Sequence, residues 1–220
     1  TLLDRVLKAL WESGRVQGPV VVVGPVAELD VGATVVEEGE TGPQNMVRGL
    51  QTLSPTQQKG WALLCTCDLP LLSGESVNWL LDNAPEEADI VFPIITRQEY
   101  DAVLPGSPNT YAPVDGQEYT GGSIFLVRPA VIAQNLPLIE QVFAARKGLV
   151  PMARLGGIGL LWRFLTRTLT VEYVEQRASQ LTGCRCRAAR HAPPQLAADV
   201  DTMEDYQYVC QWLTDRGPRL

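Results

Sequence analysis

Strand-sized apolar runs alternate with amphipathic helical segments along much of this chain, and this alternation restricts its fold most. The run VVVV at 20–23 is β-branched throughout, which is typical of a strand buried on both faces. WALLCT at 61–66 is a second, almost wholly apolar run. Helical periodicity marks LLDRVLKALWES at 2–13 and SGESVNWLLDN at 73–83. Because this order favours right-handed crossovers, we predict an α/β protein with a Rossmann-like, mostly parallel sheet, in one domain spanning 1–220.

The remaining segments continue the same pattern with one interruption. Strands or extended segments are predicted at 33–38, 88–94, 124–127 and 183–190, and helices at 42–53, through much of 129–181 and at 204–216. Pro43 suits a first helical turn, and Ser73 is a natural N-cap. Residues 96–120 are rich in Pro, Gly, Asn, Asp and Tyr. They predict a long polar loop, a feature that is often functional.

Composition narrows the functional classes. The chain has a net charge of −7 and lacks a basic stripe, so we expect no nucleic-acid partner. No apolar run of about 18 residues occurs, so we expect no membrane span and no membrane partner. Five cysteines, an odd number, in a chain long enough for a full core favour reduced thiols and a cytoplasmic location.

An apolar strand that ends on a carboxylate is the main functional signal. Asp68 lies two residues after the run at 61–66, at the strand end where ligands bind in open α/β sheets. A carboxylate there suits a hard cation such as Mg²⁺. The alternative is that Asp68 caps the next helix, although Ser73 already supplies a cap.

A second acidic cluster, DVDTMEDY, lies near the end of the chain. Asp201, Glu204 and Asp205 are explained well by capping and by the first turn of a final helix. Asp199 is less easily explained in that way. We therefore predict that Asp68 and Asp199, from distant parts of the chain, converge on one metal ion.

Other segments give weaker functional signals, and the absence of some motifs disfavours whole classes of enzyme. Gly121 and Gly122 precede a strand and permit close backbone approach, and Arg146 with Lys147 is a candidate phosphate contact. His191 is the only histidine, which leaves no histidine-based triad or metal cluster. Neither a G-x-x-x-x-G-K-[ST] loop nor a G-x-G-x-x-G turn after a strand occurs, so P-loop hydrolysis and hydride transfer are disfavoured.

The order of several stretches resembles the MobA-like nucleotidyltransferases. These stretches are LLDRVLKAL, VVVVG, GPQNMVRGL, CDLPLL, TGGSIFLVRP and DVDTMEDY, which together span nearly all of residues 1–213. The resemblance implies a sheet of the glycosyltransferase-A type. It also implies transfer of a nucleoside monophosphate from a nucleoside triphosphate (NTP) to a small phosphorylated acceptor, with release of pyrophosphate.

The same resemblance implies roles for individual residues. Asp68 is the first Mg²⁺ ligand and Asp199 the second, with Asp201 as the next candidate, while Gly121 and Gly122 face the acceptor. The base or ribose is lined by Gly42, Pro43, Gln44 and Asn45. The family's first strand and its Gly-rich, basic loop are expected ahead of Thr1, and Ser123 and Met203 stand where the family has Asn and Pro.

Two other classes of protein remain as alternatives. One is a metal-dependent glycosyltransferase on the same fold, which usually carries an Asp-x-Asp motif in mid-chain. Here Asp-Val-Asp occurs only near the end, at 199–201. The other is a non-catalytic nucleotide-binding or scaffold domain.

Overall fold

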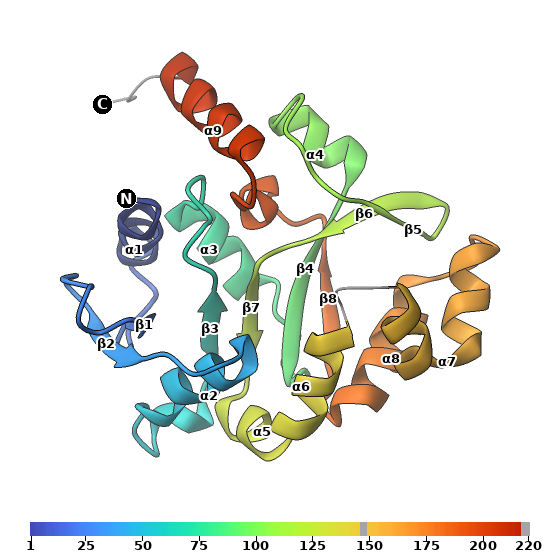
Figure 1. Ribbon diagram of the computed structural model, residues 1–220, viewed down its shortest axis with the longest axis horizontal. Coiled ribbons are helices and arrows are strands. Elements are labelled where there is room, and N and C mark those ends of the chain that lie inside the picture. Colours follow the sequence, from blue (N-terminus) through green and yellow to red (C-terminus); the bar gives the residue numbers. More distant parts are fainter. Residues whose placement is uncertain (146–148, 217–220) are drawn as a thin grey trace.

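The computed structural model describes residues 1–145 and 149–216, with side chains described in those ranges except at 149–154, 156 and 216 (Figure 1). The strands are β1 (Val21–Gly24), β2 (Thr34–Glu37), β3 (Ala62–Cys65), β4 (Ile90–Thr96), β5 (Ala112–Val114), β6 (Gln117–Gly121), β7 (Ile124–Val127) and β8 (Cys186–Arg190). The α-helices are α1 (Leu2–Glu12), α2 (Gly42–Gln51), α3 (Gly74–Asp82), α4 (Arg97–Val103), α5 (Pro129–Gln134), α6 (Leu136–Ala145), α7 (Leu149–Leu165), α8 (Val171–Thr182) and α9 (Met203–Arg216). Two short 3₁₀ turns, η1 (Gln57–Lys59) and η2 (Pro194–Ala197), complete the described elements.

The main sheet is largely antiparallel, so the prediction of a mostly parallel sheet is wrong. β7 pairs antiparallel with both β3 and β4, and β6 pairs antiparallel with β4 and β5. Only β8 pairs parallel with β4 in this sheet. The strands β3, β7, β4 and β8 lie side by side across the centre of Figure 1. The prediction failed because the chain after β4 and α4 forms the β5–β6 hairpin and then enters the sheet as β7, between β3 and β4. In the described segment between β4 and β7, no crossover helix on a face of the sheet connects the two strands, so β7 runs antiparallel to both neighbours.

The strands that the alternating pattern predicted do share one direction. β3 and β4 both run opposite to β7, and β8 runs with β4. Their carboxyl ends and the amino end of β7 therefore meet at one edge of the sheet. This edge carries the candidate site.

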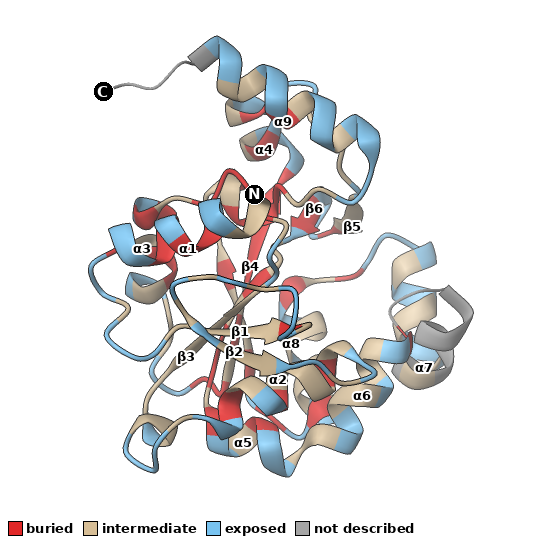
Figure 2. Cartoon of the chain, turned by 60° about the vertical axis from the view of Figure 1, so that its left-hand side comes forward, coloured by how far each residue is buried: buried red, intermediate tan, exposed pale blue. Residues whose placement is uncertain are grey.

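Helical layers cover both faces of the sheet, as the side-chain alternation of β3 illustrates. Leu63 and Cys65 pack into the core cluster that contains residues of α1, α3 and α9. Ala62 and Leu64 pack into a second cluster with residues of α2, α5 and α6. Because successive side chains of a strand point to opposite faces, an uninterrupted apolar run is what a doubly covered strand requires. Figure 2 shows the buried residues concentrated along the central strands.

Capping residues in the sequence correctly predicted the ends of several helices. The Thr41 hydroxyl caps α2 with proline in the first turn, and the Ser73 hydroxyl accepts from the backbone N–H of Ser76 at the start of α3. Gly14, expected to close the first helix, has a φ of 63° and follows the C-cap Ser13. These ends are fixed by residues next to them, so the sequence predicts them without knowledge of tertiary packing.

Two local predictions are wrong. Residues 96–120 form α4 and the β5–β6 hairpin rather than an irregular loop. Thr96 caps α4 in a capping box with Glu99, and Asp115 with Gly116, both at positive φ, turn the hairpin. The valines of β1 are half-buried rather than buried on both faces, because β1 belongs to a separate two-stranded sheet in which it pairs only with β2.

The outer edge of β8 is satisfied by side chains of the neighbouring helix. The Ser179 hydroxyl accepts a hydrogen bond from the Cys186 N–H at 2.9 Å, and a Glu175 carboxylate oxygen accepts one from the Ala188 N–H at 2.8 Å. Both acceptors come from α8, so this helix closes the sheet on that side. No helix in the described ranges is long and apolar enough to cross a membrane.

Candidate functional site

Asp68 and Asp199 lie together at the carboxyl edge of the main sheet. Asp68 follows β3, and its backbone carbonyl accepts a hydrogen bond from the Val200 N–H at 3.0 Å. Asp199 follows η2, and its half-buried carboxylate has a raised pKa. Burial is the main cause of that rise, and the negative charges of Asp201 and Asp68 add to it. Asp68 and Asp199 are distant in the sequence, but in the structure they lie close enough for the charge of one to raise the pKa of the other.

Ser123 connects the two acidic segments through all of its polar groups. Its hydroxyl donates to Oδ2 of Asp199 at 3.2 Å, and its carbonyl accepts from the Thr66 N–H at 3.1 Å. Its own N–H donates to the Leu196 carbonyl at 2.9 Å. One residue at the start of β7 thus fixes the end of β3 and the loop that carries Asp199.

Gly122 makes this close approach possible. A Cβ atom at Gly122 would lie 2.5 Å from Cγ of Pro93 and 2.7 Å from the carbonyl oxygen of Leu196. A Cβ at the neighbouring Gly121 would meet nothing within 4 Å, and Gly121 is exposed. The two glycines, predicted as a pair, therefore differ: Gly122 packs β4 against η2, whereas Gly121 borders open space.

The chemistry of the two carboxylates fits a hard divalent cation. Oδ1 of Asp68 is buried and has no hydrogen-bond partner among the described residues. A buried carboxylate oxygen without a partner is costly, and the nearby charge of Asp199 increases that cost. No group of three or more Asp, Glu, His or Cys side chains suited to a metal occurs in the described part of the chain. Two protein carboxylates suit Mg²⁺, which usually keeps water and phosphate ligands.

The rest of the closing acidic cluster serves the last helix. Oδ2 of Asp205 accepts from the N–H and the hydroxyl of Thr202, and the Thr202 hydroxyl accepts in turn from the Asp205 N–H. This capping box starts α9, with Glu204 also in its first turn. The capping interpretation is therefore confirmed for Asp205, and Asp201 is an exposed side chain beside Asp199.

The predicted base-binding residues support a neighbouring loop. Oδ1 of Asn45 accepts from the Gly39 N–H at 2.6 Å, and Oε1 of Gln44 accepts from the Glu40 N–H at 3.1 Å. Pro43 is fully buried, and a Cβ at Gly42 would lie 2.6 Å from the Phe143 ring of α6. These hydrogen bonds run to the segment before α2 rather than to Asp68 or Asp199. Arg146 and Lys147, the predicted phosphate contacts, lie outside the described residues.

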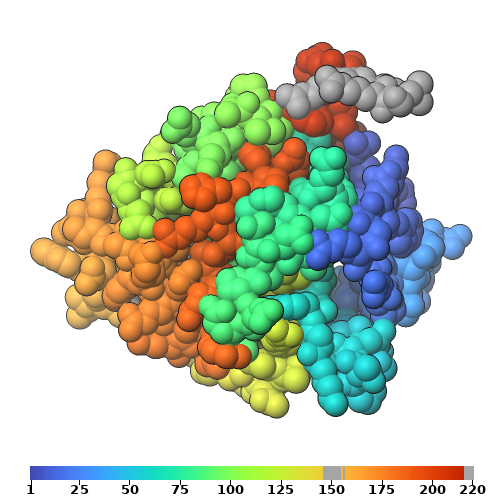
Figure 3. Space-filling view, turned by 180° about the vertical axis from the view of Figure 1, so that it is seen from behind, coloured from blue at the N-terminus to red at the C-terminus, as the bar shows by residue number. Residues whose placement is uncertain are grey.

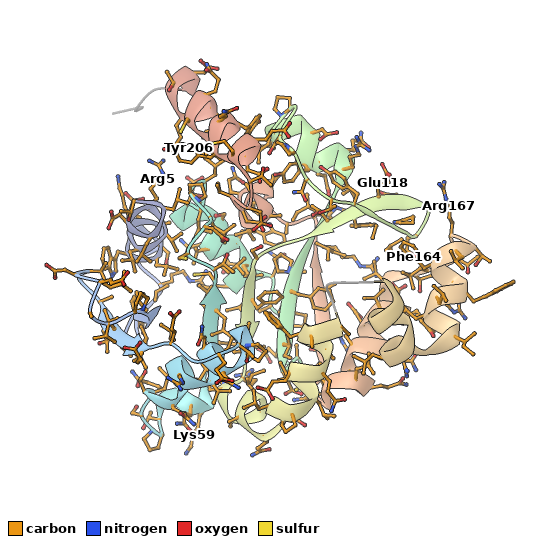
Figure 4. All side chains as sticks on the ribbon, in the orientation of Figure 1. Arg5, Lys59, Glu118, Phe164, Arg167 and Tyr206 are labelled. Atoms are coloured by element: carbon orange, nitrogen blue, oxygen red, sulfur yellow. The ribbon has the colours of Figure 1, made fainter. Side chains whose placement is uncertain are left out.

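Two residues at the site were not predicted to act there. From the sequence, Ser123 stands only where the family has Asn, but its place after two glycines at the start of a strand is a signal that could have predicted a role at the site. Arg5, on the exposed side of α1, donates from Nε to the Pro70 carbonyl at 2.9 Å and so holds the turn that follows Asp68. Figure 4 shows Arg5 and Tyr206 above the carboxyl end of β3, contributed by α1 and α9. No sequence signal pointed to this contact, because it spans 65 positions.

Solved structures share this architecture. The chain matches a hypothetical transferase from Thermus thermophilus with a TM-score of 0.81 and 31% identity, over 93% of this chain and 85% of that one. It also matches CMP:2-keto-3-deoxy-manno-octonic acid synthetase, solved in complex with CTP, with a TM-score of 0.57 and 14% identity, over 98% and 88% of the two chains. No curated protein gives a significant match. Together with the site at the sheet edge, these matches place the chain among α/β proteins that share a fold with a transferase.

The family follows from the sequence match itself. The model of the MobA-like NTP transferase domain matches residues 1–171, more than half of the chain. The chain belongs to this family, as its motif order indicated.

Proposed function

We propose that the protein transfers a nucleoside monophosphate from an NTP to a small phosphorylated acceptor and releases pyrophosphate. In this proposal, residues 1–220 act as one catalytic domain of the glycosyltransferase-A type. Family membership supports the class of reaction. The observation that carries the assignment to a site is the pairing of Asp68 and Asp199 at the sheet edge, with a buried Asp68 oxygen that lacks a partner.

Asp68 and Asp199 are the residues that would hold Mg²⁺, and Asp201 is the next nearest candidate in the chain. When bound, the ion supplies neutralisation of the phosphate charge that builds up during transfer. Two oxygens of protein carboxylates with phosphate and water as the remaining ligands make a suitable set for this ion. A glycosyltransferase would use the same ion, so the donor, a free NTP or a nucleotide sugar, distinguishes the two.

The chain's own residues contribute mainly positioning. The Ser123 hydroxyl orients the Asp199 carboxylate through its hydrogen bond to Oδ2. Arg5 holds the Asp68–Pro70 turn, and the exposed Gly121 borders the acceptor. A phosphate acceptor is already an anion, so it attacks without a general base. This agrees with the position of the chain's one histidine, His191, whose Nδ1 pairs with a Glu99 carboxylate oxygen rather than with Asp68 or Asp199. The amino-terminal turn of α2, at 42–45, lines the base or ribose.

Thermal unfolding with nucleotide and Mg²⁺ tests the proposal. The wild type is heated with CTP, GTP, ATP or UTP, each with and without Mg²⁺, and with a nucleotide sugar as the competing donor. We expect stabilisation by at least one NTP that requires the ion, worth about 2.7 kcal/mol at a hundredfold excess over Kd. Asp68→Asn and Asp199→Asn should each abolish the part that depends on Mg²⁺.

The ion-free stability of these variants provides the internal control. Because the Asp68 oxygen is unpartnered and faces a like charge, Asp68→Asn should unfold at the same temperature as the wild type or higher without Mg²⁺. Asp30→Asn, at an exposed acid between β1 and β2, should respond to Mg²⁺ and nucleotide like the wild type. Stabilisation by no NTP would favour a scaffold domain, and stabilisation only by nucleotide sugars would favour a glycosyltransferase.

A further inference from the structure

The second half of α7 exposes large apolar side chains on one helical stripe. Ile158, Trp162 and Leu165 are 85%, 66% and 68% exposed, and their spacing of four and three residues places them on the same side of the helix. Leu160 and Phe164 of the same helix face inward and pack on the core cluster that includes Tyr173 of α8. The inner face thus anchors the helix, and the outer stripe has no cover among the described residues.

Two arginines flank this stripe. Arg163 and Arg167 are exposed beside it, and Arg163 stacks on the Tyr173 ring at 4.6 Å. In the sequence, residues 141–171 contain five basic and no acidic side chains, whereas the rest of the chain contains 13 basic and 25 acidic ones. This segment is therefore basic and apolar within an acidic protein. We call Ile158, Trp162, Arg163, Leu165 and Arg167 the α7 patch.

The α7 patch lies on a rim of the molecule. Figure 1 shows α7 at the right-hand edge, and Figure 4 places Arg167 on that side with Phe164 further inward. From behind, the orange residues of this region form the left-hand edge of the molecule in Figure 3. The exposed tryptophan and the neighbouring apolar side chains can insert between lipid headgroups, and arginines beside them can bind lipid phosphates.

We propose that the α7 patch docks the protein on an anionic lipid surface. The apolar stripe enters the headgroup region while the arginines meet lipid phosphates. The acidic remainder of the chain is repelled by the same surface, which fixes the orientation of the protein. The sequence analysis expected no membrane partner because no apolar run is long enough to span a bilayer. Docking on a lipid surface requires no such span, and no helix in the described ranges could form one.

A second copy of the chain is the less favoured occupant. A symmetric contact between two α7 patches would bring the arginines of both copies into one interface. Like charges at a desolvated contact oppose such a pairing. An anionic bilayer removes this repulsion and adapts to a projecting helix.

Vesicle flotation of the full chain tests the proposal. Vesicles of phosphatidylcholine alone are compared with vesicles containing about 30% phosphatidylglycerol, at low and high salt. We expect binding to the anionic vesicles at low salt, and binding at least tenfold weaker to neutral vesicles. Trp162→Ser should weaken anionic binding about tenfold or more, and Arg167→Gln about fivefold. Both variants should keep the wild-type unfolding midpoint, because the replaced side chains are exposed.

Trp11→Ser is the matched control, since Trp11 is 51% exposed on α1 and lies outside the α7 patch. Its binding should equal that of the wild type. Absence of binding to anionic vesicles, equal binding to neutral ones, or equal loss in Trp11→Ser and Trp162→Ser would overturn the proposal. So would a wild-type dimer in light scattering that dissociates on Trp162→Ser, because the patch would then bind a second copy. None of these outcomes bears on the nucleotide site.

Discussion

The substitution Gly122→Ala tests whether close packing at one glycine holds the candidate site together. The added methyl group would lie 2.5 Å from Cγ of Pro93 and 2.7 Å from the carbonyl oxygen of Leu196. The second neighbour is backbone, so it moves only if η2 moves. At Gly121 the same methyl group meets nothing within 4 Å, and neither glycine has a positive φ. Gly121→Ala is therefore a matched control one residue away.

The expected loss follows from two terms. Overpacking against rigid neighbours costs about 1–3 kcal/mol. Displacing Leu196 also breaks the 2.9 Å hydrogen bond from the Ser123 N–H, worth about 1 kcal/mol. We therefore expect Gly122→Ala to lower the free energy of unfolding by about 2–4 kcal/mol. Gly121→Ala should stay within about 0.5 kcal/mol of the wild type or gain slightly, because alanine restricts the unfolded chain.

Urea unfolding of the three proteins at neutral pH measures both effects. The midpoint should fall for Gly122→Ala at an unchanged slope, which would indicate a change in stability rather than in compactness. Because η2 leads into Asp199, the same variant should also bind Mg²⁺ and nucleotide more weakly than Gly121→Ala does. Equal midpoints for the two alanine variants would refute the packing argument.

Two further predictions concern single contacts. The bidentate hydrogen bonds of Arg185 hold the pKa of Asp89 below its ordinary value, so the pair stabilises the fold above the unfolded pKa of about 3.9 and loses that effect as pH falls through the lower folded value. Asp89→Asn should thus cost about 2–3 kcal/mol at pH 7 and much less near pH 2 in urea unfolding, and a pH-independent cost would contradict this. Ser123→Ala should change the free energy of unfolding by only about 1 kcal/mol but weaken Mg²⁺-dependent nucleotide binding about fivefold or more in calorimetry. Ser123→Thr keeps the hydroxyl and should restore most of that binding. Unchanged binding in the alanine variant would show that Ser123 is not part of the site.

Much of the local structure could be predicted from the sequence, because its causes are local. The caps at Thr41 and Ser73 and the apolar run of β3 depend on neighbouring residues and on side-chain alternation. The direction of β7 could not be predicted, because it depends on where a hairpin inserts between strands distant in sequence. Residues 96–120 were predicted as a long loop because turn-forming residues are common both in irregular loops and in the tight turn of a hairpin.

The candidate site also contains residues that the sequence predicts and contacts that it does not. Asp68 was found because a carboxylate ends an apolar strand, and Asp199 because helix capping did not account for it. Their approach is consistent with the strand directions, which bring the ends of β3 and β8 to one edge. The contacts that fix them, from Ser123 and Arg5, cross 76 and 65 positions and leave no pattern in a single sequence. Residues 42–45 were predicted from resemblance alone, and their role in binding a base remains a prediction.

Anomalous diffraction from crystals grown with Mn²⁺ and a nucleotide that stabilises the protein would locate the ion directly. We predict one strong peak within about 2.3 Å of a carboxylate oxygen of Asp68 and of one from Asp199, with nucleotide phosphate oxygens completing the ligands. A peak elsewhere, or ordered nucleotide with the two carboxylates turned away from a common point, would contradict the shared ion on which the proposed reaction depends.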